Sequence, residues 1–330
     1  MISIKKHTTM KTLMQVLLVA VLFTACTKEA SNEFIMDPAN PQNDTTWATS
    51  TVDDNAPVNK LIESLALPYL VDSFDIVTGG VLHCDNNGQI NMPANCLEQP
   101  VTGKVKVEYL YLKTKGDMVR YAKPTVSNNR LLISGGAFFL KVSKDGNNYQ
   151  LAANAKIKIL YTNPSPDNVM QLFYGDTTVN SLDGFTWQPS NDSSGVTTWR
   201  QEDSSGVTTG YQLLSKKFGW INCDKFADTS VTRTRLVDTL PVNFTNKNTA
   251  VFAVFKEQWS VLRLYADAAN KYFYADNIPV GSKIILLSIS KVGDDFYLGS
   301  KEVTVTANAI EGLEPQITTM DNISSFIDSL

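Results

Sequence analysis

The sequence predicts a mainly β protein with two β-sandwich-like domains in tandem, a short helix before the first domain and a helix at the C-terminus. Charged residues make up only 19% of the 330 residues, and Val, Thr, Ser, Asn and Tyr are plentiful, a mixture that favours strands and turns. Short alternating segments are separated by turn residues at regular intervals, as in sandwich folds. The chain is too long for one small sandwich, and about 100–200 residues per domain gives two domains.

The N-terminal segment predicts a bacterial lipoprotein signal peptide over residues 1–25. Lysines precede a short apolar run, Val16–Phe23, and the small residues Thr24 and Ala25 stand directly before Cys26, an order typical of secretory signals. The run is far shorter than the roughly 20 residues that cross a bilayer. We therefore expect Cys26 to be acylated and to become the first residue of the mature chain. The alternative is an ordinary signal peptide followed by a chance cysteine.

Residues 26–57 are expected to form a flexible tether that lifts the folded part of the chain off the lipid. Their central stretch, Asp37–Asp44, is rich in Pro, Asn and Asp and lacks apolar periodicity. Such a composition is typical of linkers because it offers too little apolar surface to bury. We interpret Trp47 within this segment as incidental.

A short amphipathic helix is expected to begin at Pro57 and to end before Pro68. Proline suits the first position of a helix, and a second proline stops it. The apolar residues fall at helical spacing, i, i+3, i+4 and i+7, and they are Val58, Leu61, Ile62 and Leu65. We expect this apolar stripe to dock on the first domain.

The first β domain, counted with this helix, is expected over residues 58–180. Residues 81–92 predict a hairpin around the turn Asp85–Gly88. In residues 104–111, Lys and Glu alternate with Val and Tyr, which gives a strand with one wet and one buried face. Residues 131–142 predict a long apolar strand, in which Gly135-Gly136 indicates a β-bulge or a close backbone approach.

Residues 181–215 are expected to form an exposed loop that contains a tandem duplication. Asp192–Thr198 returns as Asp203–Thr209 with the identical sequence DSSGVTT. This period is far shorter than the repeats that build solenoids, and surface loops tolerate insertions at little cost in free energy. A repeated ligand-contact motif is the alternative.

The second β-rich domain is expected over residues 216–330. Six segments have the composition of strands, and Val292–Asp295 predicts a turn between two of them. The segments are Val251–Phe255, Val261–Tyr265, Tyr272–Ala275, Ile284–Ile289, Phe296–Leu298 and Val303–Thr306. Apolar residues at helical spacing then predict a C-terminal helix, and they are Met320, Ile323, Phe326, Ile327 and Leu330.

Three cysteines follow Cys26 in the chain, namely Cys84, Cys96 and Cys223. An oxidising envelope compartment allows one disulfide among them, and Cys84 and Cys96 are the nearest pair in sequence. Proximity in sequence does not establish the geometry of a bridge, so three buried thiols are the alternative. We expect no metal site from these residues, because the sequence lacks the CxxC spacing of zinc sites.

Candidate catalytic groups are few. His83 is a candidate for acid–base chemistry, since imidazole titrates near neutral pH, and Cys223 is a candidate nucleophile that would need His83 beside it. The expected positions favour a structural His83 in a hairpin and a core thiol at Cys223, next to Trp220. We therefore predict no catalytic residue.

Acidic and aromatic residues offer two further kinds of site. A glycoside hydrolase needs two carboxylates at a defined separation, and the candidate pairs are Asp72 with Asp75 and Asp294 with Asp295. Asp85–Gly88 lacks the carboxylates and glycine spacing of a calcium loop, so we expect no metal or cofactor. Aromatic residues on the predicted strands belong either to the core or to a sugar-stacking patch, and they are Tyr109, Tyr111, Tyr272, Phe273 and Tyr274.

The charge balance indicates which partners to expect. The formal net charge is −4, and removal of residues 1–25 would take away lysines and no acidic residue. Binding to nucleic acid needs clustered Lys and Arg that neutralise phosphates, so we expect no nucleic acid partner. The expected partners are the membrane, through acylated Cys26, and an envelope protein or a glycan.

One part of the sequence resembles a known sandwich domain. The run Gly79-Gly80, Asn87-Gly88, Ile90–Asn95 and Val101–Val105 resembles the opening of the β-sandwich domain shared by ankyrins, netrin receptors and the zona occludens protein. In those animal proteins the domain is a docking module, and some relatives cleave themselves at a His-Phe-Ser step. That step is absent here, because Cys84 follows His83. The resemblance therefore implies a docking module without self-cleavage.

A fuller resemblance is to uncharacterised envelope lipoproteins of Gram-negative bacteria, and it covers most of residues 75–310. The stretches that carry it are Thr114–Met118, Lys123–Thr125, Leu132–Gly136, Phe218–Phe226, Asn243–Thr245, Ala250–Phe252 and Leu298–Val303. This resemblance implies an envelope location and supplies no catalytic residue.

Together these features favour a lipid-anchored, non-enzymatic lipoprotein of the bacterial outer membrane that acts as a binding, adhesion or structural module. Two alternatives stay open at this stage. One is an accessory glycan-binding protein in polysaccharide uptake, and the other is a hydrolase with an unrecognised site. The sequence leaves both the periplasmic and the surface-exposed side of the membrane open.

Overall fold

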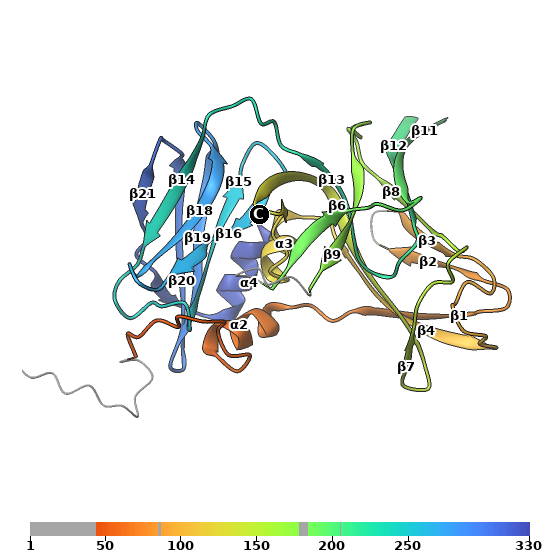
Figure 1. Cartoon of the computed structure of the whole chain (residues 1–330), viewed down its shortest axis with the longest axis horizontal. Coiled ribbons are helices and arrows are strands. Elements are labelled where there is room, and N and C mark those ends of the chain that lie inside the picture. Colours follow the sequence, from red (N-terminus) through yellow and green to blue (C-terminus); the bar gives the residue numbers. More distant parts are fainter. Residues whose placement is uncertain (1–43, 85–86, 178–183, 205) are drawn as a thin grey trace, which may run out of the picture. The chain divides into compact units, whose positions relative to one another are not determined.

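The strands build four β-sheets, so the expected mainly β class is confirmed (Figure 1). The computed structural model describes residues 44–330 apart from 85–86, 178–183 and 205. The predicted signal peptide, Cys26 and the first part of the tether lie outside the described residues. The four sheets pair into two β-sandwiches, each with its own apolar core.

Two sheets form the first sandwich. The first sheet runs β1 (Leu70–Asp75), β4 (Lys104–Leu112), β6 (Arg130–Lys144), β13 (Gly219–Phe226), β9 (Gln171–Asp176) and β10 (Thr186–Pro189), while β5 (Val126–Ser127) and β7 (Asn147–Tyr149) pair with β6. The second sheet runs β11 (Gly195–Asp203), β12 (Gly206–Ser215), β8 (Ile157–Thr162), β3 (Gly88–Met92) and β2 (Gly80–Cys84).

The first core lies between these two sheets because their strands alternate apolar and polar side chains. On β4, Val105, Val107 and Tyr109 are buried, whereas Lys104 and Lys106 are exposed and Glu108 is half-buried, as the alternation predicts. The Tyr109 hydroxyl also donates a hydrogen bond to the His83 carbonyl oxygen at 2.9 Å. The two sheets of the first sandwich are therefore joined by packing and by a direct polar contact.

The second sandwich consists of a third and a fourth sheet. The third runs β17 (Tyr265–Asp267), β18 (Tyr272–Pro279), β14 (Arg233–Thr239) and β21 (Ala309–Gly312), and the fourth runs β16 (Val261–Arg263), β15 (Thr249–Phe255), β19 (Lys283–Val292), β20 (Asp295–Thr304) and β22 (Gln316–Thr318). The pair β14–β21 is parallel. The other pairings in these two sheets are antiparallel.

A third core joins the two sandwiches to each other. All seven residues of β15 are buried, because its two faces enter different cores: Val251 and Ala253 face the core of the second sandwich, and Phe252 and Val254 face the third core. The third core also takes side chains from the first sheet, such as Trp187. The two predicted domains thus share buried surface, and residues 44–330 form one compact unit.

Hydrogen bonds cross the same junction. The Thr125 amide donates to the Val261 carbonyl oxygen at 2.8 Å, and the Val261 amide donates to the Thr125 hydroxyl at 2.9 Å. The Ser260 hydroxyl donates to the Leu132 carbonyl oxygen at 2.6 Å. Buried polar groups need such partners, so β16 is held in place against the first sandwich.

The helix predicted after Pro57 is confirmed as α2 (Pro57–Leu65), and it buries Val58, Leu61 and Leu65. It packs on β15 and β19, so the expected docking on the first domain is wrong. The same apolar stripe could pack on either sandwich, so the sequence does not identify the sheet on which the helix docks. As a result, the chain touches the second sandwich before it enters the first.

The C-terminal helix is also confirmed, as α4 (Met320–Asp328) with Thr319 as its N-cap. It packs on α3 (Lys115–Arg120), a helix that the sequence analysis did not predict. The sequence signal for α3 was a capping box, in which the Thr114 hydroxyl accepts a hydrogen bond from the Asp117 amide and the Asp117 side chain accepts one from the Thr114 amide.

None of the helices in the described part of the chain has the length and hydrophobicity of a membrane-spanning segment.

The expected boundaries around residue 216 differ from the structure. Within residues 181–215, expected as an exposed loop, β10 belongs to the first sheet, and residues 195–203 and 206–215 form the paired strands β11 and β12, which extend the second sheet. Strand β13, expected to open the second domain, pairs with β6 and β9 in the first sheet. The composition of β13 suits a strand in either sandwich, and only its long-range pairing shows that it belongs to the first.

Residues 195–198 of the first copy lie on β11, and residues 206–209 of the second copy lie on the neighbouring strand β12. Trp199, which follows the first copy, stands directly opposite Gly210, which follows the second. The Trp199 indole donates to the Tyr211 carbonyl oxygen at 3.1 Å. A Cβ atom on Gly210 would lie 2.7 Å from the indole and 2.0 Å from the Tyr161 carbonyl oxygen, so the ring needs a glycine beneath it.

Residues 44–52, called the strap below, pack on the second sandwich. The Trp47 ring lies 5.0 Å from the Phe273 ring between centroids. The Ala48 amide donates to the Asn246 side chain at 2.9 Å, the Asn246 amide group donates back to the Ala48 carbonyl oxygen at 2.8 Å, and Lys247 pairs with Asp44 at 2.8 Å. Trp47 is therefore not incidental, and the expected tether is shorter than residues 26–57.

Candidate functional site

A cleft of about 460 Å³ opens where the first sandwich meets the turn between β15 and β16. Strands β6, β12 and β13 supply Gly135, Tyr211 and Lys225, and the loop after β8 supplies Asn163 and Asp167. The β15–β16 turn contributes one tryptophan, Trp259. The volume falls within the range of about 300–1,000 Å³ that is typical of small-molecule sites.

A β-bulge shapes one wall of this cleft. The register between β6 and β13 shifts between Asn222 and Asp224, which pair with Ala137 and Ser134. The extra residue on β6 belongs to the Gly135-Gly136 pair, so the predicted bulge is confirmed.

The same glycines let two tyrosines approach the strand. A Cβ atom on Gly135 would lie 3.1 Å from the Tyr211 ring, and one on Gly136 would lie 3.1 Å from the Tyr111 ring. Gly136 also has φ of +127°, a conformation that side chains with a Cβ rarely adopt. Larger residues here would push both tyrosines, which line the cleft, away from it.

The charged groups of the cleft form a close pair. The Lys225 ammonium lies 2.6 Å from the Asp167 carboxylate, and about a third of each side chain is exposed. The hydrogen bond from Lys225 lowers the pKa of Asp167. Asp167 therefore stays ionised near neutral pH and can accept further hydrogen bonds.

Tyr211 is anchored to the same loop. Its hydroxyl accepts a hydrogen bond from the Asp167 amide at 2.7 Å. Burial raises the pKa of Tyr211 to about 12, so the phenol stays neutral near neutral pH. A neutral phenol next to a paired carboxylate is suited to hydrogen bonding and poorly suited to proton transfer.

Trp259 is held at the edge of the cleft by the junction of the sandwiches. The Ser134 amide donates to the Trp259 carbonyl oxygen at 2.8 Å, and the side chain packs partly against the third core. Trp259 is therefore positioned by contacts on both sandwiches, and it is half-buried where it lines the cleft.

The candidate nucleophile Cys223 and the candidate base His83 are not brought together. Cys223 is fully buried in the first core, and burial strongly raises the pKa of its thiol. His83 is exposed on β2, where its neighbours Leu82 and Cys84 point inward. A buried protonated thiol and an outward-facing imidazole cannot form a reactive pair.

The other predicted groups are also dispersed. Cys84 and Cys96 are buried in the first core and are not joined by a disulfide, which fits the behaviour of cysteine as a small apolar side chain. Asp72 is exposed on β1, and Asp294 lies in the β19–β20 turn. Part of the candidate calcium loop, residues 85–86, lies outside the described residues. Across the described part of the chain, no cluster of His, Cys, Asp and Glu has the makings of a metal site.

The five aromatic residues considered for a sugar-stacking patch do not form one surface. Tyr109 is buried in the first core, and Tyr111 stacks on Phe138 at 4.4 Å between centroids. Tyr272 and Tyr274 lie on β18 in the other sandwich. Of the five, only Tyr111 lines the cleft.

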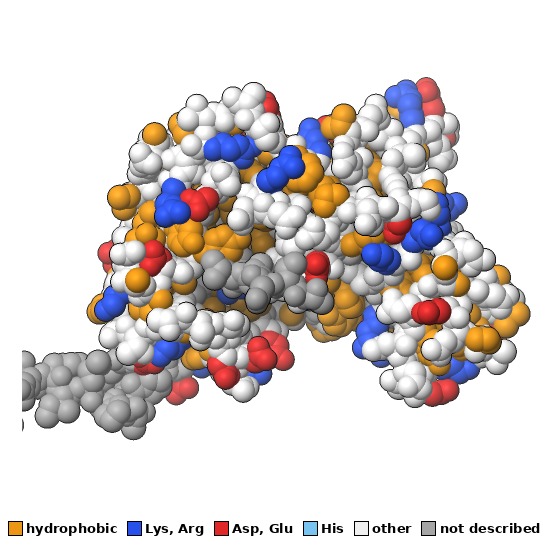
Figure 2. Space-filling view, viewed as in Figure 1, with side chains coloured by type: hydrophobic (Ala, Val, Ile, Leu, Met, Phe, Trp, Pro, Cys, Tyr) orange, Lys and Arg blue, Asp and Glu red, His pale blue; other side chains and the backbone are white. Residues whose placement is uncertain are grey.

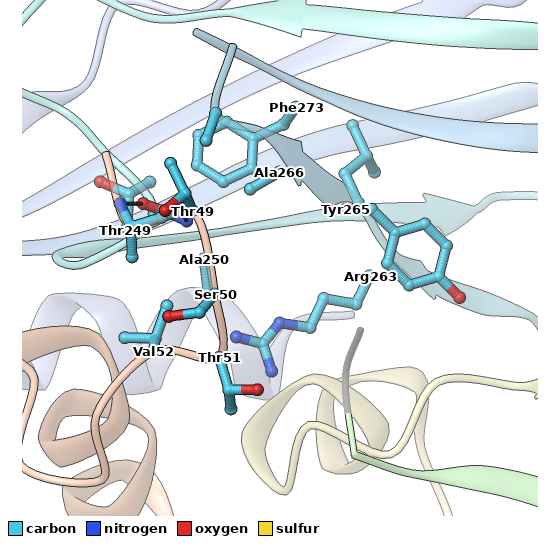
Figure 3. A pocket seen from close by; sticks show the side chains of 14 residues that line it. Thr49, Ser50, Thr51, Val52, Thr249, Ala250, Arg263, Tyr265, Ala266 and Phe273 are labelled. Carbon is cyan, nitrogen blue, oxygen red and sulfur yellow. Dashed lines mark hydrogen bonds between the residues drawn. The ribbon is translucent and has the colours of Figure 1, made fainter. Parts of the chain in front are cut away.

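A second hollow of about 250 Å³ lies under the strap (Figure 3). Its walls include Thr51 and Ser50 of the strap and Arg263, Tyr265 and Phe273 of the second sandwich. Figure 3 shows Arg263 extending toward Thr51. This hollow is smaller than the cleft, and the Phe273 ring in its wall already packs against Trp47 of the strap.

The residues that form the cleft could not have been found from sequence. Asp167, Tyr211, Lys225 and Trp259 are far apart in the chain, and no motif links them. The one useful signal in the sequence was the Gly135-Gly136 pair.

On the face drawn in Figure 2, the basic side chains are scattered among acidic and apolar ones. In comparisons with protein-family models and with curated proteins, nothing matched the chain.

Proposed function

We propose that the protein is a lipid-anchored, non-enzymatic binding module of the bacterial outer membrane, which acts in adhesion or within an envelope complex. The cleft carries this proposal. Its Asp167 carboxylate is paired with Lys225, and its one tryptophan, Trp259, is half-buried, so it offers fixed hydrogen-bonding and aromatic groups.

The rigidity of the cleft also supports a binding role. The two sandwiches that form it share the third core, and hydrogen bonds fix Trp259 and its neighbour Ser260 against β6. A preformed site loses little conformational entropy when it binds a ligand. This arrangement suits recognition of a partner in the envelope.

The anchor follows from the sequence pattern at Cys26. A single acyl chain binds membranes only reversibly, so stable attachment requires the several chains that bacterial lipoproteins receive. The chain has a formal net charge of −4, which gives it no net electrostatic attraction to anionic lipids. Attachment therefore depends on the acylated cysteine.

The substitution Cys26→Ser tests the anchor. We expect loss of radiolabelled palmitate from the protein, together with an uncleaved precursor or release from the membrane fraction. The matched control is Ser31→Ala, which leaves Cys26 in place and should keep the label. Normal lipid labelling of Cys26→Ser would refute the anchor.

A further inference from the structure

The lining of the cleft restricts the chemistry of its ligand, and this inference rests on the proposed binding function. Strongly anionic ligands are disfavoured at Lys225, because its ammonium already lies 2.6 Å from Asp167. A phosphate or carboxylate would have to displace that partner and would meet the negative charge of Asp167. Charge recognition at Lys225 therefore does not explain the cleft, and Lys113 adds a second ammonium to its lining.

A purely apolar ligand fits no better. It would remove water from the Lys225–Asp167 pair without replacing the hydrogen bonds that the water makes, and unreplaced hydrogen bonds are costly. The loop of the cleft also contains the polar residues Asn163 and Ser165. The ligand must therefore offer several donors and acceptors.

The aromatic residues add a second requirement. Trp259 is half-buried and lines the cleft together with this polar loop, whereas the Tyr211 ring is fully buried. Aromatic rings favour contact with flat, weakly polar surfaces. A ligand that satisfies both sides needs C–H groups on one face and hydroxyl groups around its edge. Pyranose rings have this distribution of groups.

We propose that the cleft binds a saccharide unit of a glycan. The ring packs on Trp259, and its hydroxyls exchange hydrogen bonds with the Asp167 carboxylate and the Lys225 ammonium. Carboxylate and ammonium groups together serve as acceptor and donor for hydroxyls, which explains why an ion pair lies in a site that contains no other described acid. A cleft of about 460 Å³ suits a mono- or disaccharide within the range of small-molecule sites.

The test uses the full-length protein in detergent and an array of neutral and acidic oligosaccharides, followed by calorimetric titration of those retained. We expect saturable binding, a loss of at least tenfold in affinity for Trp259→Ala and a smaller loss for Trp259→Phe. Asp167→Asn should weaken binding while keeping the size of the side chain. Trp47→Phe, in the strap, is the matched control and should bind as the wild type does.

Three outcomes would overturn the proposal. The first is that the wild type retains no oligosaccharide, and the second is that Trp259→Ala binds with unchanged affinity. The third is that the wild type binds acidic glycans only, that this binding is lost at high salt, and that Trp259→Ala keeps it. Thermal unfolding of each variant separates lost binding from lost folding, and Trp259→Phe keeps most of the packing. The Cys26→Ser protein should bind the same glycans in solution, so failure of the anchor and failure of the glycan site are distinguishable.

Discussion

The Arg120 guanidinium donates a hydrogen bond to the Asp328 carboxylate at 2.5 Å, although only 3% of the Arg120 side chain is exposed. The same guanidinium donates to the Leu65 carbonyl oxygen at 2.9 Å. Arg120 lies on α3, Leu65 ends α2 and Asp328 ends α4. One buried cation therefore connects the ends of the three helices that fill the junction between the sandwiches.

Asp328→Ala should lower the free energy of unfolding by about 1–3 kcal/mol, because a buried guanidinium loses its counter-charge. Asp328 itself is 69% exposed, which keeps the effect below that of a fully buried pair. In an Arg120→Met background the same substitution should cost little, since the buried charge is gone. Urea unfolding of the double-mutant cycle measures this, and equal costs in both backgrounds would contradict it.

Gly116→Ala should destabilise the protein by about 1–3 kcal/mol through overpacking. A Cβ atom at Gly116 would lie 2.0 Å from the Ile327 carbonyl oxygen, so α3 would have to move away from α4. Gly195 is the matched control, because nothing lies within 4 Å of a Cβ atom there. Thermal unfolding should separate the two variants, and an equally stable Gly116→Ala would disprove the close approach of the helices.

Asp238→Asn should flatten the pH dependence of stability. Burial, followed by the charge of Glu311, raises the pKa of Asp238 to about 8, and within the described structure both carboxyl oxygens lack a hydrogen-bond partner. Between about pH 4 and 8 the folded state keeps a proton that the unfolded state releases, so stability falls as pH rises through this window. The loss is complete above pH 8.

Unfolding free energies from pH 5 to 9 test this expectation. Wild type and Asp238→Asn should differ increasingly toward pH 8, by on the order of 1 kcal/mol for each pH unit. Asp276→Asn is the control, because Asp276 is exposed in its ion pair with Arg235. If the unfolding free energies of wild type and Asp238→Asn change with pH in parallel, the pKa of Asp238 is not raised in the folded protein.

Trp47→Ala should release the strap while leaving the rest of the fold in place. We expect a loss of about 1–2 kcal/mol, less than for a buried tryptophan, because Trp47 is only half-buried. Cleavage by limited proteolysis should become faster at residues 44–52, whereas Trp47→Phe should keep the contact with Phe273. Unchanged cleavage would indicate that the polar contacts of Asp44, Ala48 and Asn246 suffice.

Local features of the fold could be predicted from sequence, because they depend on short-range patterns. The alternation in β4, the apolar stripes of α2 and α4 and the glycine pair in β6 each produced the expected element. The long-range pairings could not be predicted in this way. Composition makes β13 a strand without choosing its sandwich, and the spacing in α2 does not identify its partner.

One overlooked pattern did contain long-range information. The unbroken apolar run Ala250–Phe255 differs from the half-polar alternation of β4, and such runs are typical of strands buried on both faces. Its double burial is what joins the sandwiches. The cleft depends on that junction, so Trp259 could be placed only once the third core was known.

The pairing of Trp199 with Gly210 explains where the two copies of the duplicated segment stop being identical. Because the strands run in opposite directions, Trp199 and Gly210 are the only equivalent positions that face each other along the hairpin. Tryptophan side chains at both positions 199 and 210 would overlap. At this crossing point the two copies therefore have to differ, and a tryptophan faces a glycine.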